Sequence, residues 1–319
     1  MHFEEKLDVV EEDIAQYSIK LLDILLKDRT TNKNIIWATS DYISCGERYA
    51  ATEQIYANLI TGIHSKLIQP RVAKAHDQKN IRTRDKAEVF TPSWICNAQN
   101  NLIDEHWFGR SDIFNTQQNN TWTATERIIF PGDKQRAWKN YVDARRIEVS
   151  CGEAPYLVSR YDTVTGDPIE LLSRIGLLDR KLRVVTENAT DEKEWLKWAY
   201  RAYESIYGFE FQGDNLLLAR ENLLYTFIDY MRYALKRTPS TDELKKVATI
   251  ISWNLWQMDG LTYGPPLCDI QQEMQQLSLF DFIETETLIA QKTTKSRCKI
   301  KDWRSKVIVE YYALAKGER

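Results

Sequence analysis

The chain has 319 residues, of which 43% are hydrophobic, 12 are glycine and 8 are proline. This composition is sufficient to bury a core in one large or two modest domains. The net charge of −3 excludes a protein coated in basic residues, so any contact with nucleic acid must come from a local patch or from a partner chain. Because there is no membrane-length apolar run and the first residues are acidic, we expect a cytoplasmic protein with no membrane contact.

Cysteine and histidine are scattered singly along the chain. The five cysteines form no Cys-x-x-Cys pair and are odd in number, and the four histidines are equally dispersed. This pattern predicts neither a zinc site nor a disulfide framework, and we expect reduced thiols and no bound metal. No Ser/His/Asp arrangement typical of a hydrolase stands out.

The first residues carry apolar side chains at helical spacing. In "LDVVEEDIAQYSIKLLDILL" they recur at steps of three and four, so we expect residues 1–68 to be a helical region. The stretch 69–86 that follows, "QPRVAKAHDQKNIRTRDK", is rich in lysine and arginine. It is a candidate phosphate-contacting loop, with an ordinary solvated surface as the alternative.

A helix is predicted to begin in "AEVFTPSWICNAQNNLIDEHWF". Thr91 suits the N-cap and Pro92 the first helical position. The backbone N–H groups after Thr91 would then be free to meet a ligand carboxylate. The polar stretch after it, "SDIFNTQQNNTWTATER", indicates a surface loop.

Strand and helix patterns alternate from about residue 146 to 260. A short buried strand at 146–150 leads into a turn at 151–155, and residues 154–190 are irregular with a turn at "DTVTGDP". Helix resumes at Asp191, and an aromatic strand covers 205–211 with a long helix after it. Ser240 caps a further helix, and a third apolar segment then ends at Asp259. This alternation predicts an open, mainly parallel sheet, and the last residues indicate a strand or hairpin.

Each of the three expected strands ends in a distinctive polar residue. The first ends in Ser150-Cys151-Gly152, the second in Glu210 and the third in Asp259. Ligands of open α/β sheets bind beyond these ends. There Glu210 could accept hydrogen bonds from both ribose hydroxyls of a ligand, and Asp259 could accept one from an adenine amino group. With one glycine in place of Gly-x-Gly-x-x-Gly, we expect a nucleoside without phosphates rather than NAD or FAD.

Four segments together resemble one enzyme family. They are "AEVFTP", "EVSCGEA", "YGFEFQGDNLLLARENLL" and "IISWNLWQMDGL". In this order they resemble the S-adenosylmethionine-binding half of adenine-specific DNA methyltransferases of restriction-modification systems, as in Type I modification subunits and Type IIG enzymes. The resemblance covers roughly residues 86–262. It implies an α/β fold with an incomplete Rossmann-like methyltransferase sheet, a helical region at 1–85 before it and a C-terminal extension at 263–319.

The resemblance also assigns the cofactor-binding residues. The methionine part of S-adenosylmethionine would be held by Phe90, Thr91 and Pro92. The turn against the cofactor would be formed by Ser150, Cys151 and Gly152. Glu210 would bind the ribose, Phe211 would lie beside the adenine, and Asp259 would accept from the adenine amino group.

Two features depart from the family pattern. Ala154 stands where the first turn usually has a second glycine, and Pro155 follows it, so we expect a stiffer loop and a tighter pocket. The interval between Glu153 and Glu210 is long, which implies an inserted segment that packs elsewhere.

The catalytic motif of the family is missing. No Asn/Asp-Pro-Pro-Tyr/Phe occurs, and the closest text, "YGPPL" at 263–267, lacks both the amide and the aromatic residue, so we assign no catalytic residue. Three hypotheses remain: a split enzyme whose partner brings catalysis and DNA recognition, a non-catalytic S-adenosylmethionine-binding regulatory or structural protein of a restriction or defence system, and a helical interaction protein. We favour the first.

A split enzyme has structural consequences. The truncated sheet should expose an edge and an apolar face beside the cofactor pocket, and the partner's catalytic strand should add next to the strands ending at 150 and 259. Separately, Gln276–Phe280, "QLSLF", resembles the motif by which bacterial proteins bind the DNA sliding clamp. The alternative is an apolar staple that folds back on its own domain.

Overall fold

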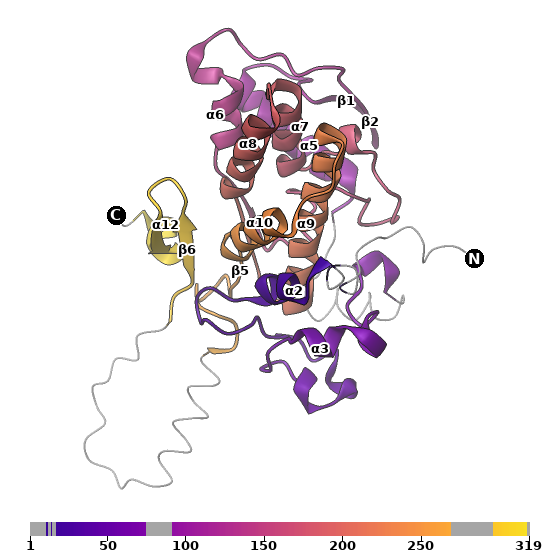
Figure 1. The fold of residues 1–319 in the computed structure, drawn as a ribbon, viewed down its shortest axis with the longest axis vertical. Helices are drawn as coiled ribbons and strands as arrows, with labels where there is room; N and C mark the ends of the chain where they lie inside the picture. The colour runs from indigo at the N-terminus through magenta and orange to yellow at the C-terminus, as the bar shows by residue number, and fades with distance from the viewer. Residues whose placement is uncertain (1–10, 12–13, 15–16, 75–90, 269–295, 318–319) are drawn as a thin grey trace, which may run out of the picture.

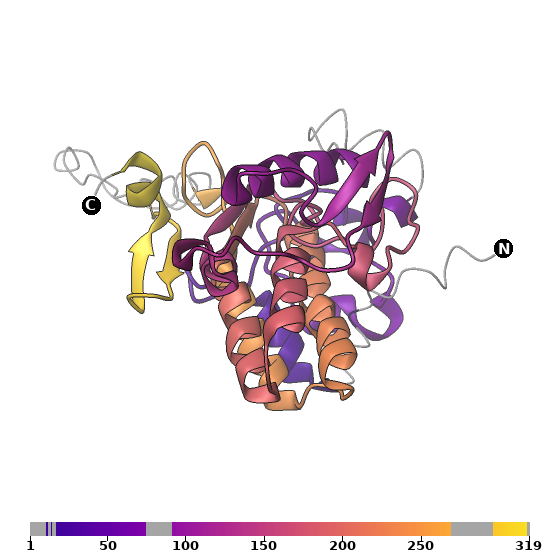
Figure 2. The ribbon, with the colours of Figure 1, turned by 90° about the horizontal axis from the view of Figure 1, so that it is seen from above.

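The computed structural model describes residues 11, 14, 17–74, 91–268 and 296–317. The fold is mixed α/β, with a small parallel sheet beside a group of packed helices (Figures 1 and 2). The helices are α2 (Ile19–Leu26), α3 (Ala57–Ile60), α5 (Ser93–Phe108), α6 (Trp138–Asp143), α7 (Leu177–Asn188), α8 (Glu192–Glu204), α9 (Gly213–Leu235), α10 (Thr241–Asn254) and α12 (Tyr311–Lys316). Within the described ranges, none of the helices has both the length and the apolar character needed to span a bilayer.

The strands form one parallel sheet and two antiparallel hairpins. They are β1 (Asn115–Gln118), β2 (Thr121–Ala124), β3 (Arg146–Val149), β4 (Ile206–Glu210), β5 (Leu255–Gln257), β6 (Lys299–Asp302) and β7 (Val307–Glu310). The parallel sheet has the order β3-β4-β5, and the hairpins are β1-β2 and β6-β7. The strands predicted at 146–150 and 205–211 are confirmed, as is the C-terminal hairpin. The third is short because α10 continues to Asn254.

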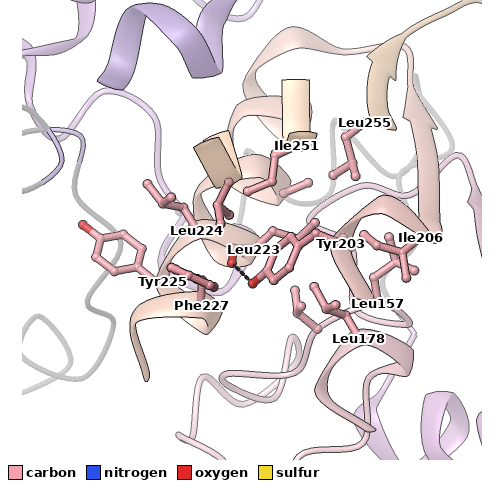
Figure 3. Packing of buried hydrophobic residues seen from close by; sticks show 14 of the residues in the cluster. Leu157, Leu178, Tyr203, Ile206, Leu223, Leu224, Tyr225, Phe227, Ile251 and Leu255 are labelled. Atoms are coloured by element: carbon pink, nitrogen blue, oxygen red, sulfur yellow. Dashed lines mark hydrogen bonds between the residues drawn. The ribbon is translucent and has the colours of Figure 1, made fainter. Parts of the chain in front are cut away.

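Helices cover one face of the parallel sheet. The core on this side is built by aromatic and aliphatic side chains from α7, α8, α9 and α10 (Figure 3). Tyr203 and Phe227 meet edge to face, and the Tyr203 hydroxyl donates to the carbonyl of Leu223 at 2.7 Å. Over β4 and β5 the other face is covered by the C-terminal hairpin, where Ile300 and the preceding Cys298 pack in one cluster with the aromatic residues of these two strands.

A buried arginine joins three separate parts of the chain. The guanidinium of Arg220, on α9, donates to the carbonyls of Leu25 and Lys27 at the end of α2 and to that of Leu255 where α10 passes into β5. The last carbonyls of a helix lack intrahelical donors and carry partial negative charge, so one cation satisfies both helix ends. Burial lowers the pKa of Arg220 to about 9, against the opposing effect of Asp28, and the side chain stays charged at neutral pH.

The N-terminal segment closes the β5 edge of the sheet. The side-chain amide of Gln257 accepts from the Ile36 N–H at 2.9 Å and donates to the Ile36 carbonyl at 2.8 Å. Gly213 donates its N–H to the Trp37 carbonyl at 3.0 Å, and a Cβ at Gly213 would lie 2.0 Å from the Ile36 carbonyl oxygen. The β5 edge is therefore occupied by this segment.

Three predictions about local structure were wrong. The described part of the region 1–68 is α-helical only in places, because residues 27–56 run as turns, isolated bridges and two short 3-10 helices, Ile43–Cys45 and Glu47–Tyr49. The stretch predicted as a surface loop forms the β1–β2 hairpin, in which Asn119 adopts the φ of 53° that a two-residue turn requires. The irregular stretch 154–190 contains α7.

Replacing Arg220 with methionine should destabilise the fold strongly. The substitution leaves three buried carbonyls without donors, so we expect the free energy of unfolding to fall by at least about 3 kcal/mol. Arg232→Met is the matched control on the same helix, because Arg232 is exposed and contacts only the Tyr17 hydroxyl among the described residues. Urea unfolding measures both variants, and equal losses would contradict the role given to Arg220.

Candidate functional site

The turn after β3 holds three residues in the left-handed backbone region. Ser150, Gly152 and Ala154 have φ values of 50°, 53° and 64°. Only glycine adopts this region without a steric penalty, and residues held in it cluster at ligand sites. The N–H of Cys151 donates to the carbonyl of Phe209 at 2.9 Å. Cys151 thus makes the ladder hydrogen bond that a regular strand would make through Ser150, and Ser150 is displaced from the ladder. The backbone is therefore sharply folded at the end of β3.

Ala154 has a left-handed backbone conformation although it is not a glycine. Its φ of 64° is one that glycine adopts freely, and its methyl group is fully buried. An L-residue in this region costs roughly 1–2 kcal/mol. Ala154 therefore adds backbone strain to this turn.

Glu210 connects the end of β4 to this turn. Its carboxylate accepts from the Gly152 N–H at 2.9 Å and from the Gln212 N–H at 3.2 Å. Burial raises the pKa of Glu210, and the hydrogen bonds from Gly152 and Gln212 oppose that rise. The sequence prediction that Gly152 and Glu210 lie together at the carboxyl ends of the strands is confirmed.

Cys151 is a packed thiol. Its side chain is buried, and burial together with the nearby carboxyls of Glu148 and Glu210 raises its pKa well above the usual value. A thiol that is kept protonated is a poor nucleophile. The role of Cys151 is therefore to fill the space beneath the turn.

Glu148 is a buried acid at this site that the sequence did not single out. The predicted strand was expected to bury its apolar side chains, but Ile147 and Val149 are 44% and 61% exposed and Glu148 points inward. The Glu148 carboxyl accepts from the N–H groups of Tyr156 and Leu157 at 3.3 and 3.1 Å. Burial, helped by Glu210, raises its pKa to about 8. An acidic residue inside a strand directly before a glycine turn was the signal available in the sequence.

Part of the basic stretch lies against the turn. The Arg71 N–H donates to one oxygen of Glu153 at 2.6 Å, and the Tyr161 hydroxyl donates to the other at 2.6 Å. Lys74 forms a 3.5 Å ion pair with Asp214 at the start of α9, and both side chains are buried. A phosphate-contacting role is therefore wrong for Lys74, while residues 75–86 of this stretch lie outside the described residues.

The start of α5 differs from the prediction. The helix begins at Ser93 with Pro92 as its N-cap, so Thr91 is not the N-cap residue and Pro92 is not the first helical residue. Asp162 from the "DTVTGDP" turn caps the helix with its side chain, accepting from the Ser93 N–H at 3.1 Å. A protein carboxylate therefore occupies the position predicted for a ligand carboxylate. Phe90 lies outside the described residues.

Burial by itself would raise the pKa of Asp162. Hydrogen bonds from Thr165, Ser93 and Val164 outweigh that effect and lower it below the usual value. Asp162 therefore caps α5 as a carboxylate and closes its own turn at the same time. Thr91 lies next to this turn, where its carbonyl accepts from the Thr163 hydroxyl at 3.0 Å.

Asp259 and Phe211 follow the neighbouring strands. Met258 donates its N–H to the Glu210 carbonyl at 3.0 Å, which places Asp259 one residue beyond the ladder. One oxygen of Asp259 accepts from the Leu261 and Thr262 N–H groups and holds the following turn. Phe211 is half-buried, and its carbonyl accepts from the Gln257 side chain. These two residues lie at the same end of the sheet as Glu210.

Comparison with known proteins gives no significant match to the chain from protein-family models, curated proteins or solved structures. The methyltransferase resemblance therefore rests on the four sequence motifs alone. Among the residues that the structure places, no group of three or more His, Cys, Asp or Glu side chains is arranged to hold a metal ion.

Ser150→Gly should stabilise the protein. Ser150 is exposed and has a φ of 50°, so glycine relieves steric strain without losing buried contacts. After allowing for the added flexibility of the unfolded chain, we expect a gain of about 0.5–1 kcal/mol. Ser65→Gly is the control, because Ser65 has an ordinary φ of −61° and should lose stability. Thermal unfolding compares the two, and a loss at both positions would contradict the strain.

The substitution Glu148→Gln should increase the stability of the fold relative to wild type as the pH rises. The folded chain keeps the Glu148 proton up to a pKa of about 8, whereas the unfolded carboxyl releases it near 4.5, so this group costs stability as pH rises between those values. The variant should lie within about 1 kcal/mol of wild type at pH 4.5 and be the more stable protein at pH 8. Urea unfolding at both pH values tests this, and a difference independent of pH would contradict it.

Proposed function

We propose that this chain is the S-adenosylmethionine-binding subunit of a split adenine-specific DNA methyltransferase of the restriction-modification type. A partner chain would supply the Asn-Pro-Pro-Tyr-type motif and DNA recognition, and this chain would contact DNA mainly through the complex. One observation carries the proposal: the carboxylate of Glu210, at the end of the second strand, accepts from the N–H of Gly152 in the strained turn after the first. The parallel sheet would then be part of a Rossmann-like methyltransferase fold.

The donors and acceptors at this end of the sheet fit the nucleoside part of the cofactor. Each oxygen of Glu210 accepts one backbone N–H, and a carboxylate has about four acceptor sites, so both ribose hydroxyls could still donate to it. Gly152 has no Cβ to block a close approach. Asp259 uses only one of its oxygens in its own turn, which leaves the other to accept from an adenine amino group.

The methionine part would lie nearer α5. Thr91 and Pro92 immediately precede that helix, and Tyr156, which follows the strained turn, interacts with Thr91 through its side chain. Because Asp162 already holds the Ser93 N–H, the methionine carboxylate would need other donors. The bound cofactor supplies the methyl group, and this chain's residues bind and orient it.

The sheet topology changes where a partner could complete the enzyme. We expected the partner's strand to lie next to both the strand ending at 150 and the strand ending at 259. This expectation is wrong, because β3 and β5 lie on opposite edges of the sheet with β4 between them, and one added strand cannot adjoin both. The N-terminal segment occupies the β5 edge, which leaves β3. A regulatory cofactor-binding protein is the second candidate, and the coverage of β4 and β5 by the C-terminal hairpin favours it. The uncovered β3 favours the split enzyme.

Calorimetry with S-adenosylmethionine tests the site. The wild-type chain should bind it, and Glu210→Gln should weaken binding by at least about tenfold, because charge-assisted hydrogen bonds contribute about 1.5–3 kcal/mol each. Glu126→Gln is the control, since Glu126 is exposed and lies outside both the turn at 150–154 and the ends of β4 and β5. Folded wild-type protein that binds no S-adenosylmethionine, alone or with its partner, or equal affinities for the two variants, would refute the proposal.

A further inference from the structure

In the part of the chain that the structure describes, one edge of the parallel sheet is open. Among the described residues β3 pairs with β4 alone, and Arg146 donates its N–H to Ser205 on that side. Successive residues of a strand in a parallel ladder direct their N–H groups to opposite edges. The N–H groups of Ile147 and Val149 therefore point away from β4, toward the open edge. Such an edge is a template for another strand.

The same strand carries exposed apolar side chains. Ile147 and Val149 share a face with Tyr207 and Phe209, their partners in the register of β4. The C-terminal hairpin buries Tyr207 and Phe209, whereas it leaves Ile147 44% and Val149 61% exposed. The hairpin therefore covers the sheet as far as β4 and stops short of β3.

A groove of about 240 Å³ runs between β3 and the C-terminal hairpin. Its apolar lining comes from Ile147, Tyr207 and Trp256 of the sheet and from Val309, Tyr311 and Leu314 of β7 and α12. Leu314 is half-exposed at its rim. The groove thus extends the apolar surface of β3 toward α12, and contiguous apolar surfaces of this kind mark protein interaction sites.

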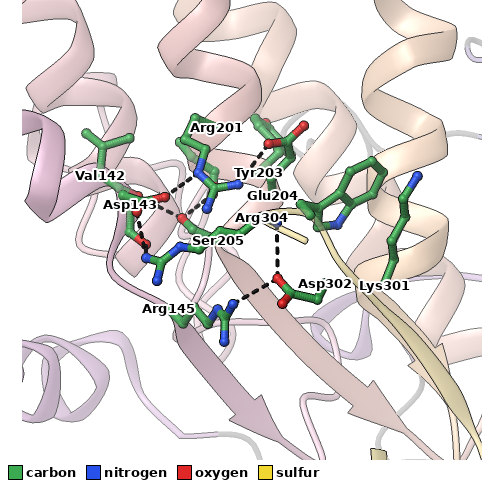
Figure 4. Close-up of polar contacts among 12 residues, drawn as sticks. Val142, Asp143, Arg145, Arg201, Tyr203, Glu204, Ser205, Lys301, Asp302 and Arg304 are labelled. Atoms are coloured by element: carbon green, nitrogen blue, oxygen red, sulfur yellow. Dashed lines mark hydrogen bonds and ion pairs between the residues drawn. The ribbon is translucent and has the colours of Figure 1, made fainter. Parts of the chain in front are cut away.

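One cation at this groove is unmatched. Figure 4 shows how the hairpin is held: Arg145 pairs with Asp302 at 2.8 Å, and Arg304 pairs with Asp143 at 2.6 Å. Arg146 also lines the groove, but it forms no ion pair within the described part of the chain, and its guanidinium donates only to the Arg145 carbonyl. A ligand with a carboxylate near the start of β3 would complement it.

We propose that the β3 edge and this groove form the docking site for an extended segment of a partner polypeptide. The segment would add as a strand to β3, cover Ile147 and Val149, place an apolar side chain in the groove and direct a carboxylate at Arg146. The inference rests on the proposed function in one respect: the partner is the chain that completes the methyltransferase.

A second copy of this chain fits the site less well. Two β3 edges could pair only with each other, because the N-terminal segment occupies the β5 edge. Such a pair offers Arg146 no carboxylate from β3, since Glu148, the acidic residue of that strand, is buried. The unmatched charge therefore favours a different polypeptide.

Val149→Pro tests the edge directly. Proline removes an N–H that lies outside the β3–β4 ladder, so the fold should be kept while strand addition is blocked. The probe is the polypeptide encoded beside this chain that carries the Asn-Pro-Pro-Tyr motif. Sedimentation should show a complex of this polypeptide with the wild-type chain. The affinity should fall at least about tenfold for Val149→Pro and for Arg146→Glu. It should change less for Val149→Ala, which keeps the N–H.

Separate measurements distinguish failure of the interface from failure of the proposed function. Affinity for S-adenosylmethionine should be the same in wild type and Val149→Pro, because Val149 is outside the cofactor site. If the wild type binds no cofactor, the proposed function fails. If cofactor binding is normal but no complex forms, or Val149→Pro assembles like wild type, the docking inference fails.

Hydrogen exchange on the isolated full-length chain identifies other occupants. The Ile147 and Val149 amides should exchange rapidly, and they should become protected only in the complex. Protection in a monomer would show that another segment of this chain covers the edge. Protection in a dimer would show a second copy there, and either result overturns the inference.

Discussion

The guanidinium of Arg220 is the interaction on which the arrangement of this chain most depends. It satisfies the carbonyls at the end of α2 and at the junction of α10 with β5, and it does so from the middle of α9. Burying a cation without a directly paired carboxylate is costly, and several carbonyl acceptors offset that cost only if all of them stay in place. Arg220 therefore requires the N-terminal segment to lie beside β5, and this closes one edge of the sheet and leaves the other edge as the place where the molecule can be extended.

The candidate site also depends on buried ionisable side chains that form hydrogen bonds with the backbone. Glu210 and Glu148 are buried acids with raised pKa values, and each accepts backbone N–H groups from the chain around the turn after β3. Those bonds hold Gly152 and the strained Ala154 in position. The turn is thus prepared before any ligand arrives, which lowers the ordering cost of binding. Strained backbone positions of this kind cluster at ligand sites, and this supports the ligand-binding role proposed above.

Much of the central sheet and its helices could be predicted from the sequence. The aromatic strand at 205–211, the Ser240 capping box and the long helix α9 all follow from local patterns, and the structure confirms them. Helix α7 could not be found in this way, because Arg180 and Lys181 lie in its buried face and mask the apolar stripe. The N-terminus of α5 is capped by Asp162, which lies 69 residues further along the chain than Ser93. Glu148 points inward because the apolar side chains of its strand, Ile147 and Val149, are on the exposed face. These features arise from tertiary contacts that no local pattern records.

The central claim is that an adenosine-containing cofactor binds above the turn at residues 150–154. A crystal structure of the wild-type chain grown with S-adenosylmethionine tests it most directly. The account predicts that the ribose hydroxyls donate to the Glu210 carboxylate, with the adenine between Phe211 and Asp259. Density for the ligand elsewhere on the molecule, with Glu210 bonded only to Gly152 and Gln212, would contradict it.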